Sequence, residues 1–180
     1  ARGEVYVKGT LEELTGTGTV QAVVEELGPV AAVFQVARKA SADGTEQEIR
    51  IERADVTLSG TPTKASARGT VEIEGEKVRF KGDVSWANVT WPLRNPRPAE
   101  LLVASRQGKA HVEGSPESYK AQLEADVAGL AGGKIQPGRW ALAGQGDLDS
   151  FRFDRVAGRL LGGSITSRGE VAWKPQVRWN

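Results

Sequence analysis

The chain has 180 residues, enough for one sizeable core, and its 24 basic and 23 acidic residues leave a formal net charge of +1. Lysine and arginine alternate with glutamate and aspartate instead of forming a basic patch, which argues against a nucleic-acid-binding protein. The sequence contains no cysteine, which excludes disulfides, thiolate metal sites and cysteine nucleophiles.

The first strand-like run, residues 4–8, begins close to the first residue, and the sequence contains no methionine. We therefore expect a piece of a longer protein. No apolar run approaches the roughly 18 residues that a membrane-spanning helix needs. The one segment of helical composition is residues 20–27, where Gly28-Pro29 would end at most one short helix.

Three segments share the pattern apolar-x-Gly-Ser/Thr, with their glycines at Gly9, Gly60 and Gly114. Pro62 and Pro116 follow the second and third of these glycines, and proline suits the second position of a turn because its φ is already fixed. The pattern predicts a turn between strands at each of the three places.

Apolar residues recur with a period of two in residues 77–86, 119–127, 139–142 and 151–154. Successive side chains of a strand point to opposite faces, so each of these strands has one apolar and one charged face. A charged face must meet water, which favours an antiparallel over a parallel sheet and predicts an all-β fold. Parity within the strands assigns twelve residues to a common apolar interior: Val78, Phe80, Val84, Trp86, Leu123, Val127, Trp140, Leu142, Phe151, Phe153, Val171 and Trp173.

A longer repeat involves four of the five tryptophans. Gly82-Asp83-Val84-Ser85-Trp86 precedes Val89-Thr90-Trp91, and Gly169-Glu170-Val171-Ala172-Trp173 precedes Val177-Arg178-Trp179. The spacing predicts two strand–turn–strand units within one continuous sheet segment, residues 1–180, with approximate repeat units 1–91 and 92–180.

Residues with catalytic or metal-binding chemistry are few. The one histidine, His111, has neither a cysteine nor a second histidine with which to bind zinc, so we expect it at an exposed or rim position. The acidic pairs at 12–13, 25–26 and 147/149 fall where turns are expected, and we interpret them as solvated. The glycine pairs 16/18 and 144/146 lack the third glycine of a phosphate-binding loop and indicate bulges or close backbone approach. We expect no enzymatic activity, no metal and no cofactor.

An ordered series of short motifs makes the second half of the chain distinctive. The series is Gly82-Asp83-Val84-Ser85-Trp86, Val89-Thr90-Trp91-Pro92-Leu93, Ser105-Arg106-Gln107-Gly108-Lys109-Ala110-His111-Val112-Glu113-Gly114, Tyr119, Leu142-Ala143-Gly144-Gln145-Gly146-Asp147-Leu148, Leu161-Gly162-Gly163, Gly169-Glu170-Val171-Ala172-Trp173 and Trp179. In this order the chain resembles the TamB family, the inner-membrane subunit of the translocation and assembly module of Gram-negative bacteria. It looks like the C-terminal-type β-repeat region of that family.

The resemblance implies a long curved sheet folded lengthwise into an open apolar trough, a β-taco. It also implies a periplasmic segment of an inner-membrane-anchored protein that reaches TamA, an outer-membrane protein of the Omp85 class. Phospholipid acyl chains would then be the guests of the trough, during transfer between the inner and outer membranes.

Two alternatives stay open at this point. A sheet with one apolar face buries it either against a ligand or in a closed β-sandwich, where that face is simply the core. The second function is an assembly chaperone for outer-membrane β-barrels and autotransporters, which pairs an edge strand with incoming strands.

Overall fold

The computed structural model describes residues 2–10, 12–24, 28–91, 103–128, 138–160, 162–173 and 178–179, and every regular element within them is a β-strand. The strands are β1 (Arg2–Gly9), β2 (Glu13–Val24), β3 (Gly28–Ala40), β4 (Glu46–Leu58), β5 (Lys64–Glu74), β6 (Lys77–Trp91), β7 (Val103–Ser115), β8 (Ser118–Ala128), β9 (Gly138–Gly146), β10 (Ser150–Leu160), β11 (Gly163–Ala172) and β12 (Arg178–Trp179).

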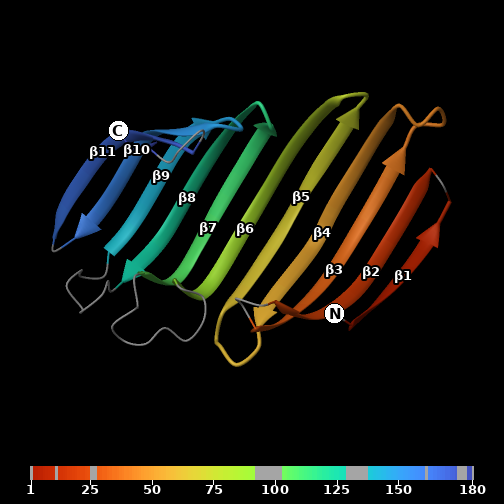
Figure 1. Ribbon diagram of the computed structural model, residues 1–180, viewed down its shortest axis with the longest axis horizontal. Coiled ribbons are helices and arrows are strands. Elements are labelled where there is room, and N and C mark those ends of the chain that lie inside the picture. The colour runs from red at the N-terminus through yellow and green to blue at the C-terminus, as the bar shows by residue number, and fades with distance from the viewer. Residues whose placement is uncertain are drawn as a thin grey trace.

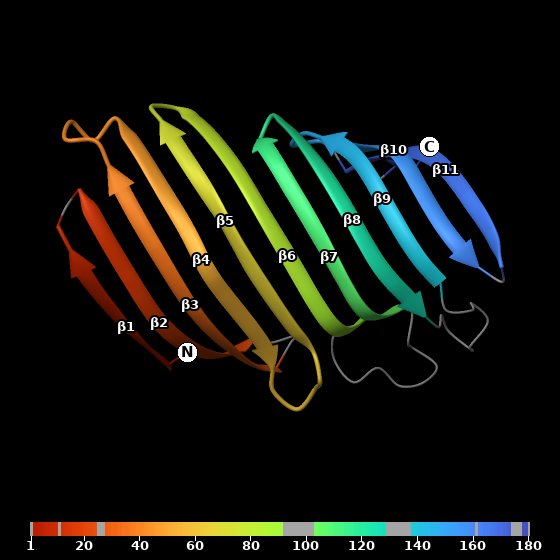
Figure 2. The ribbon, with the colours of Figure 1, turned by 180° about the vertical axis from the view of Figure 1, so that it is seen from behind.

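All twelve strands form one antiparallel sheet in which spatial order equals chain order (Figures 1 and 2). Each strand from β2 to β11 pairs with its predecessor and its successor along the chain, so the sheet is a meander that grows sideways. Its long axis therefore runs across the strands (Figure 1).

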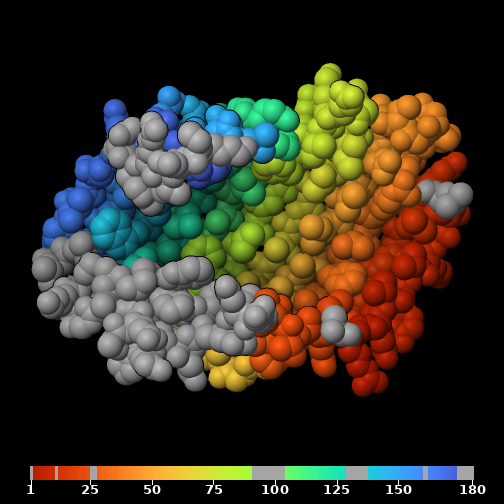
Figure 3. All heavy atoms as spheres, in the orientation of Figure 1, coloured from red at the N-terminus to blue at the C-terminus, as the bar shows by residue number. Residues whose placement is uncertain are grey.

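The sheet is curved, and β-bulges interrupt three of its strands at regular intervals. Register shifts fall between Ile51 and Ala54 in β4, between Ser105 and Gly108 in β7, and in β10 just after Phe153. A bulge bends its strand and increases the local right-handed twist. One bulge in every third strand thus distributes the curvature along the sheet, whose face in Figure 3 is hollowed along its middle.

The curved sheet does not close on itself. Among the described residues only two apolar side chains are buried, Leu58 at 7% and Ala125 at 6% exposure, and none falls below 2%. The accessible area of the chain is 12804 Å², whereas a compact monomer of 19.2 kDa would expose about 8,400 Å². The predicted open curved sheet is confirmed, and the alternative of a closed sandwich is wrong.

The three glycine turns are confirmed. Gly9, Gly60 and Gly114 have positive φ values of 136°, 81° and 140°, a backbone region that glycine reaches without the clash of a Cβ atom. Gly9 is the last residue of β1, Gly60 lies two residues past the end of β4, and Gly114 is the last residue but one of β7.

The short helix that the sequence allowed does not form in the described residues 20–24, and one local prediction is wrong. The segment of helical composition continues strand β2 as far as Val24, because residues 13–24 pair fully with β3; residues 25–27 lie outside the described part of the chain. The first tryptophan unit is not strand–turn–strand: β6 runs without a break through Asn88, whose φ of 53° bends the chain without reversing it. The second unit does reverse, since β12 pairs back onto β11.

Candidate functional site

One face of the sheet is mainly apolar along its length, and the strand registers show its layout. Residues paired between neighbouring strands lie on the same face, so chains of partners define rows that run across the strands. The first outer row is Leu14, Arg38, Ile49, Val71, Phe80, Gly114, Tyr119, Gly146, Phe151 and Val171. The second outer row is Gly3, Val20, Ala32, Val56, Ala65, Trp86, Gly108, Ala125, Trp140, Gly158 and Ile165.

Two inner rows lie between the outer rows and consist mainly of small and aliphatic residues. The first is Val7, Gly16, Val36, Ile51, Gly69, Gly82, Val112, Ala121, Gly144, Phe153 and Gly169. The second is Val5, Gly18, Phe34, Ala54, Ala67, Val84, Ala110, Leu123, Leu142, Val156 and Ser167. Neighbouring rows are two residues apart along a strand, or about 6.6 Å.

Aromatic rings of the second outer row lie flat over glycines of the next strand. A Cβ atom added to Gly108 would lie 2.1 Å from Cζ2 of Trp86, and one added to Gly158 would lie 2.7 Å from Cζ3 of Trp140. The Trp86 indole N–H donates to Oγ of Ser105 at 2.9 Å, which fixes the ring in this position. Gly108 and Gly158 are not among the glycines for which the sequence indicated close approach; at one of those, Gly144, an added Cβ atom would lie 2.2 Å from the carbonyl oxygen of Arg152 and 2.7 Å from Cε1 of Phe151.

The first outer row repeats this arrangement from β6 to β10, where rings alternate with glycines on the intervening strands. The ring centroids of Phe80 and Tyr119 are 6.3 Å apart, and those of Tyr119 and Phe151 are 6.1 Å apart. A Cβ atom on Gly146 would lie 2.8 Å from atoms of both Tyr119 and Phe151. Between β6 and β10, rings therefore border the two inner rows on both sides, and the inner rows form a lower lane between them.

Eleven of the twelve residues that the sequence assigned to a common interior share this face by register; their role in binding remains a prediction. Nine of them stand in the four rows, and Val78 and Val127 extend the same face beyond the rows. Trp173 lies one residue past β11, and its indole N–H donates to the carbonyl oxygen of Leu148 at 2.7 Å. That bond ties Trp173 to the turn before β10, outside the paired rows.

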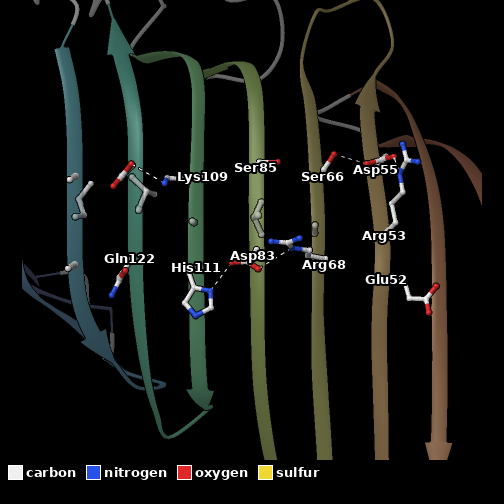
Figure 4. Close-up of a pocket in the computed structure, with 18 of the residues that line it drawn as sticks. Glu52, Arg53, Asp55, Ser66, Arg68, Asp83, Ser85, Lys109, His111 and Gln122 are labelled. Atoms are coloured by element: carbon white, nitrogen blue, oxygen red, sulfur yellow. Dashed lines mark hydrogen bonds and ion pairs between the residues drawn. The ribbon is translucent and has the colours of Figure 1, made fainter.

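The opposite face is charged, and it has an open cavity of about 1000 Å³ over β4 to β10 (Figure 4). Asp83 lies in the middle of this cavity and contacts two side chains. Nδ1 of His111 lies 2.8 Å from Oδ1 of Asp83, and Nε of Arg68 donates to Oδ2 of Asp83 at 3.2 Å. The bond from His111, and then that from Arg68, hold the pKa of Asp83 below its ordinary value. His111 is partly exposed on this charged face, away from the apolar rows.

Further ion pairs continue across the charged face. Glu124 accepts from Lys109 and Arg139, each at 3.3 Å, and the Lys109 bond lowers the pKa of Glu124. Asp55 accepts a 2.6 Å hydrogen bond from the Ser66 hydroxyl, which lowers its pKa in the same way. Cations and carboxylates are thus paired from strand to strand across the described part of this face, which is exposed to solvent.

The described residues contain no cluster of three histidine, cysteine or acidic side chains placed to hold a metal ion. They also contain no helix of the length and apolarity that a membrane span requires.

Comparison with known proteins identifies a family for this chain. Residues 35–180 match the family model described as "TamB, N-terminal domain", whereas no curated protein and no solved structure matches. The expected C-terminal type of repeat is not confirmed, since the matching model describes the N-terminal domain. This family comprises transport and assembly proteins rather than enzymes. Because the match covers most of its length, the chain belongs to the TamB family.

Proposed function

We propose that the apolar face shields phospholipid acyl chains while they move between the inner and outer membranes of a Gram-negative bacterium. The observation that carries this proposal is an apolar face continuous from β1 to β11 that the described residues leave without a protein partner. A sheet face of this kind is stable in water only if something covers it.

The lane between the ring-bearing outer rows suits an acyl chain. Each CH₂ group removed from water contributes about 0.8 kcal/mol, so a full chain gains on the order of 10 kcal/mol. Among its residues only Ser167 has a polar side chain, so nothing along most of the lane holds a guest at one place. That favours movement along the sheet over tight capture.

In this proposal the segment stands in the periplasm as part of an inner-membrane-anchored protein, and TamA of the Omp85 class is its outer-membrane partner. The long axis of the sheet, which the lane follows, then points from one membrane toward the other. Eleven strands spaced about 4.8 Å apart give the lane roughly 50 Å of length.

Site-specific photo-crosslinking tests the proposal with a matched pair of neighbouring residues. A photoreactive residue at Leu123 faces the lane, and the same residue at Gln122 faces the charged side of the same strand. We expect crosslinks to phospholipid from Leu123 and few from Gln122. Equal lipid crosslinking at the two positions, or none at Leu123, contradicts the proposal.

A second candidate function has one specific observation in its favour. Among the described strands β1 pairs only with β2, which leaves its outer edge open to another strand, and its Val5, Tyr6 and Val7 are 57%, 69% and 64% exposed. This fits the chaperone alternative, in which β1 pairs with a strand of an outer-membrane protein by β-augmentation. A photoreactive residue at Tyr6 that crosslinks to such a client, while Leu123 crosslinks to no lipid, would favour the chaperone.

A further inference from the structure

The indole N–H of Trp140 in β9 differs from those of the other tryptophans whose side chains the structure describes. The N–H of Trp86 donates to Oγ of Ser105, and that of Trp173 donates to the carbonyl oxygen of Leu148. No residue in the described part of the chain accepts a hydrogen bond from Trp140. The ring is half-buried, yet its Nε1 atom is accessible, because none of the described residues has a side-chain nitrogen or oxygen that is both buried and unpaired.

The two tryptophans of the second outer row lie on their glycines by opposite edges of the indole. The atoms of Trp86 nearest to a Cβ added at Gly108 are Cζ2, Cε2 and Cη2, the edge beside Nε1. The atoms of Trp140 nearest to a Cβ added at Gly158 are Cζ3, Cε3 and Cη2, the edge away from Nε1. Trp86 therefore brings its N–H to the strand of Ser105, whereas the N–H of Trp140 lies on the side of the ring away from Gly158.

The apolar face around Trp140 provides its N–H with no acceptor side chain. By register, the neighbours on this face in β8, β9 and β10 are all apolar: Leu123, Ala125, Val127, Gly138, Leu142, Val156 and Gly158. The adjacent residue Arg139 faces the charged side, where it donates to Glu124. A hydrocarbon chain that covered Trp140 would remove water from the N–H and leave a donor without a partner, which is unfavourable. A guest that binds well here must therefore bring its own acceptor.

We propose that the indole N–H of Trp140 donates a hydrogen bond to an ester carbonyl oxygen of a phospholipid whose acyl chains lie in the inner rows. This rests on the proposed function and adds to it a place where the linkage between chain and glycerol is recognised.

The position and chemistry of Trp140 both favour the ester group. An indole N–H is a neutral group that only donates, so it matches a neutral carbonyl, whereas a phosphate is better matched by a cation. Tryptophan also suits a boundary between apolar and polar groups, because its ring is apolar and its N–H is polar. Trp140 stands at the border of the lane, with Leu142 two residues further in. The chains then extend over Leu142, and the headgroup lies outside the second outer row.

The test compares two phosphatidylcholines that differ only in how their chains are linked, one with two ester bonds and one with two ether bonds. Both have the same fluorescent label and are delivered from detergent micelles to the purified protein. The readout is the ratio of the affinities for the ester and the ether lipid, because loss of folded protein affects both affinities equally.

We expect the wild-type protein to favour the ester lipid about fivefold, the effect of one hydrogen bond. Trp140→Phe keeps an aromatic ring but loses the donor, and it should bring the ratio close to one. The matched control Trp173→Phe also removes an indole N–H, but one that lies outside the paired rows and is bound to Leu148, so it should leave the ratio unchanged.

A wild-type ratio close to one, an unchanged ratio in Trp140→Phe, or an equal fall in Trp173→Phe overturns the assignment. If Trp140→Phe does not fold, proton–nitrogen NMR spectra of the indole groups of the wild-type protein decide. A Trp140 signal that shifts more with the ester lipid than with the ether lipid supports the hydrogen bond, and equal shifts overturn it. Failure of the proposed function itself has a different result, in which the wild-type protein binds neither lipid.

Discussion

The variant Phe153→Asp places a carboxylate in the middle of the lane. It tests whether the passage of lipid can be blocked while the fold stays stable. Phe153 is half-buried in the first inner row, its partners are Gly144 and Gly169, and its ring lies 4.9 Å from that of Phe151 in an edge contact. Loss of that ring pair costs about 0.5–1.5 kcal/mol. Loss of the partial burial of the side chain costs another 1–2 kcal/mol or so, about half of the value for full burial.

The expected total is therefore about 2–3 kcal/mol, because the new carboxylate keeps access to water from the open side. For a chain of this length that lowers the midpoint of thermal unfolding by about 5–10 °C. In a closed core the unpaired charge would add several kcal/mol and unfold a marginal domain. The control Phe153→Ala removes the same ring without the charge, and we expect its midpoint to fall by a similar amount.

The two variants diverge in lipid crosslinking. Photoreactive residues at Leu142 and Ile165 flank the substituted strand on β9 and β11. We expect Phe153→Asp to reduce crosslinking on one side of β10 relative to the other, while Phe153→Ala leaves both signals in place. Collapse of the midpoint in Phe153→Asp alone would refute the reasoning about an open face, and unchanged crosslinking at both positions would refute the lipid path.

Other parts of the structure lead to further predictions. Gly108→Ala should displace the Trp86 indole and destabilise the sheet by about 1–3 kcal/mol. Tryptophan fluorescence should change, and the midpoint of thermal unfolding should fall. In the control Gly16→Ala the added Cβ has its nearest atom at an ordinary 3.4 Å, so this variant should be tolerated. Hydrogen bonds from the Ser41 hydroxyl, and then from the N–H and hydroxyl of Thr45, lower the pKa of Asp43 from 3.8 to about 2. The ionised Asp43 therefore stabilises the fold above its unfolded-state pKa, and this is lost as pH falls toward about 2. Asp43→Asn should therefore lose less stability than the wild-type protein when denaturation is measured between about pH 5 and pH 2, and equal losses would contradict this role for the turn. Far-ultraviolet circular dichroism should show well under about a quarter helix, the level at which a mixed globular fold begins.

The periodicity of two predicted the fold and most of the apolar face, because parity within a strand requires only local sequence. It holds for Phe151 and Phe153, which occupy the same face as expected. It fails three residues later, where Val156 also reaches this face because the bulge after Phe153 shifts the phase. A bulge leaves no clear mark in the sequence, so phase beyond it becomes known only from the pairing with neighbouring strands.

Features that depend on the pairing of two strands could not be predicted from the sequence. That Gly108 lies beneath Trp86 follows from their register, and the two residues are far apart in the chain. The place of Arg38 in the first outer row was missed because β3 has apolar residues on both faces, which hides the alternation. The two tryptophan units read alike, yet the first lies within the single strand β6 and the second pairs back onto β11.

The meander gives this protein an unusual response to mechanical load. Because every strand pairs only with its neighbours in the chain, a pull applied between β1 and β11 acts along the hydrogen bonds and not along the strands. Such a load opens one hairpin at a time, with each opened strand releasing its own length of chain while the remaining pairs keep their register. The free energy of folding of such an array is approximately a sum of contributions from neighbouring strands, so loss of an outer strand leaves the rest of the sheet folded. If its two ends were anchored and pulled apart, the sheet would lengthen by one strand at a time and would shorten again when the strands re-pair.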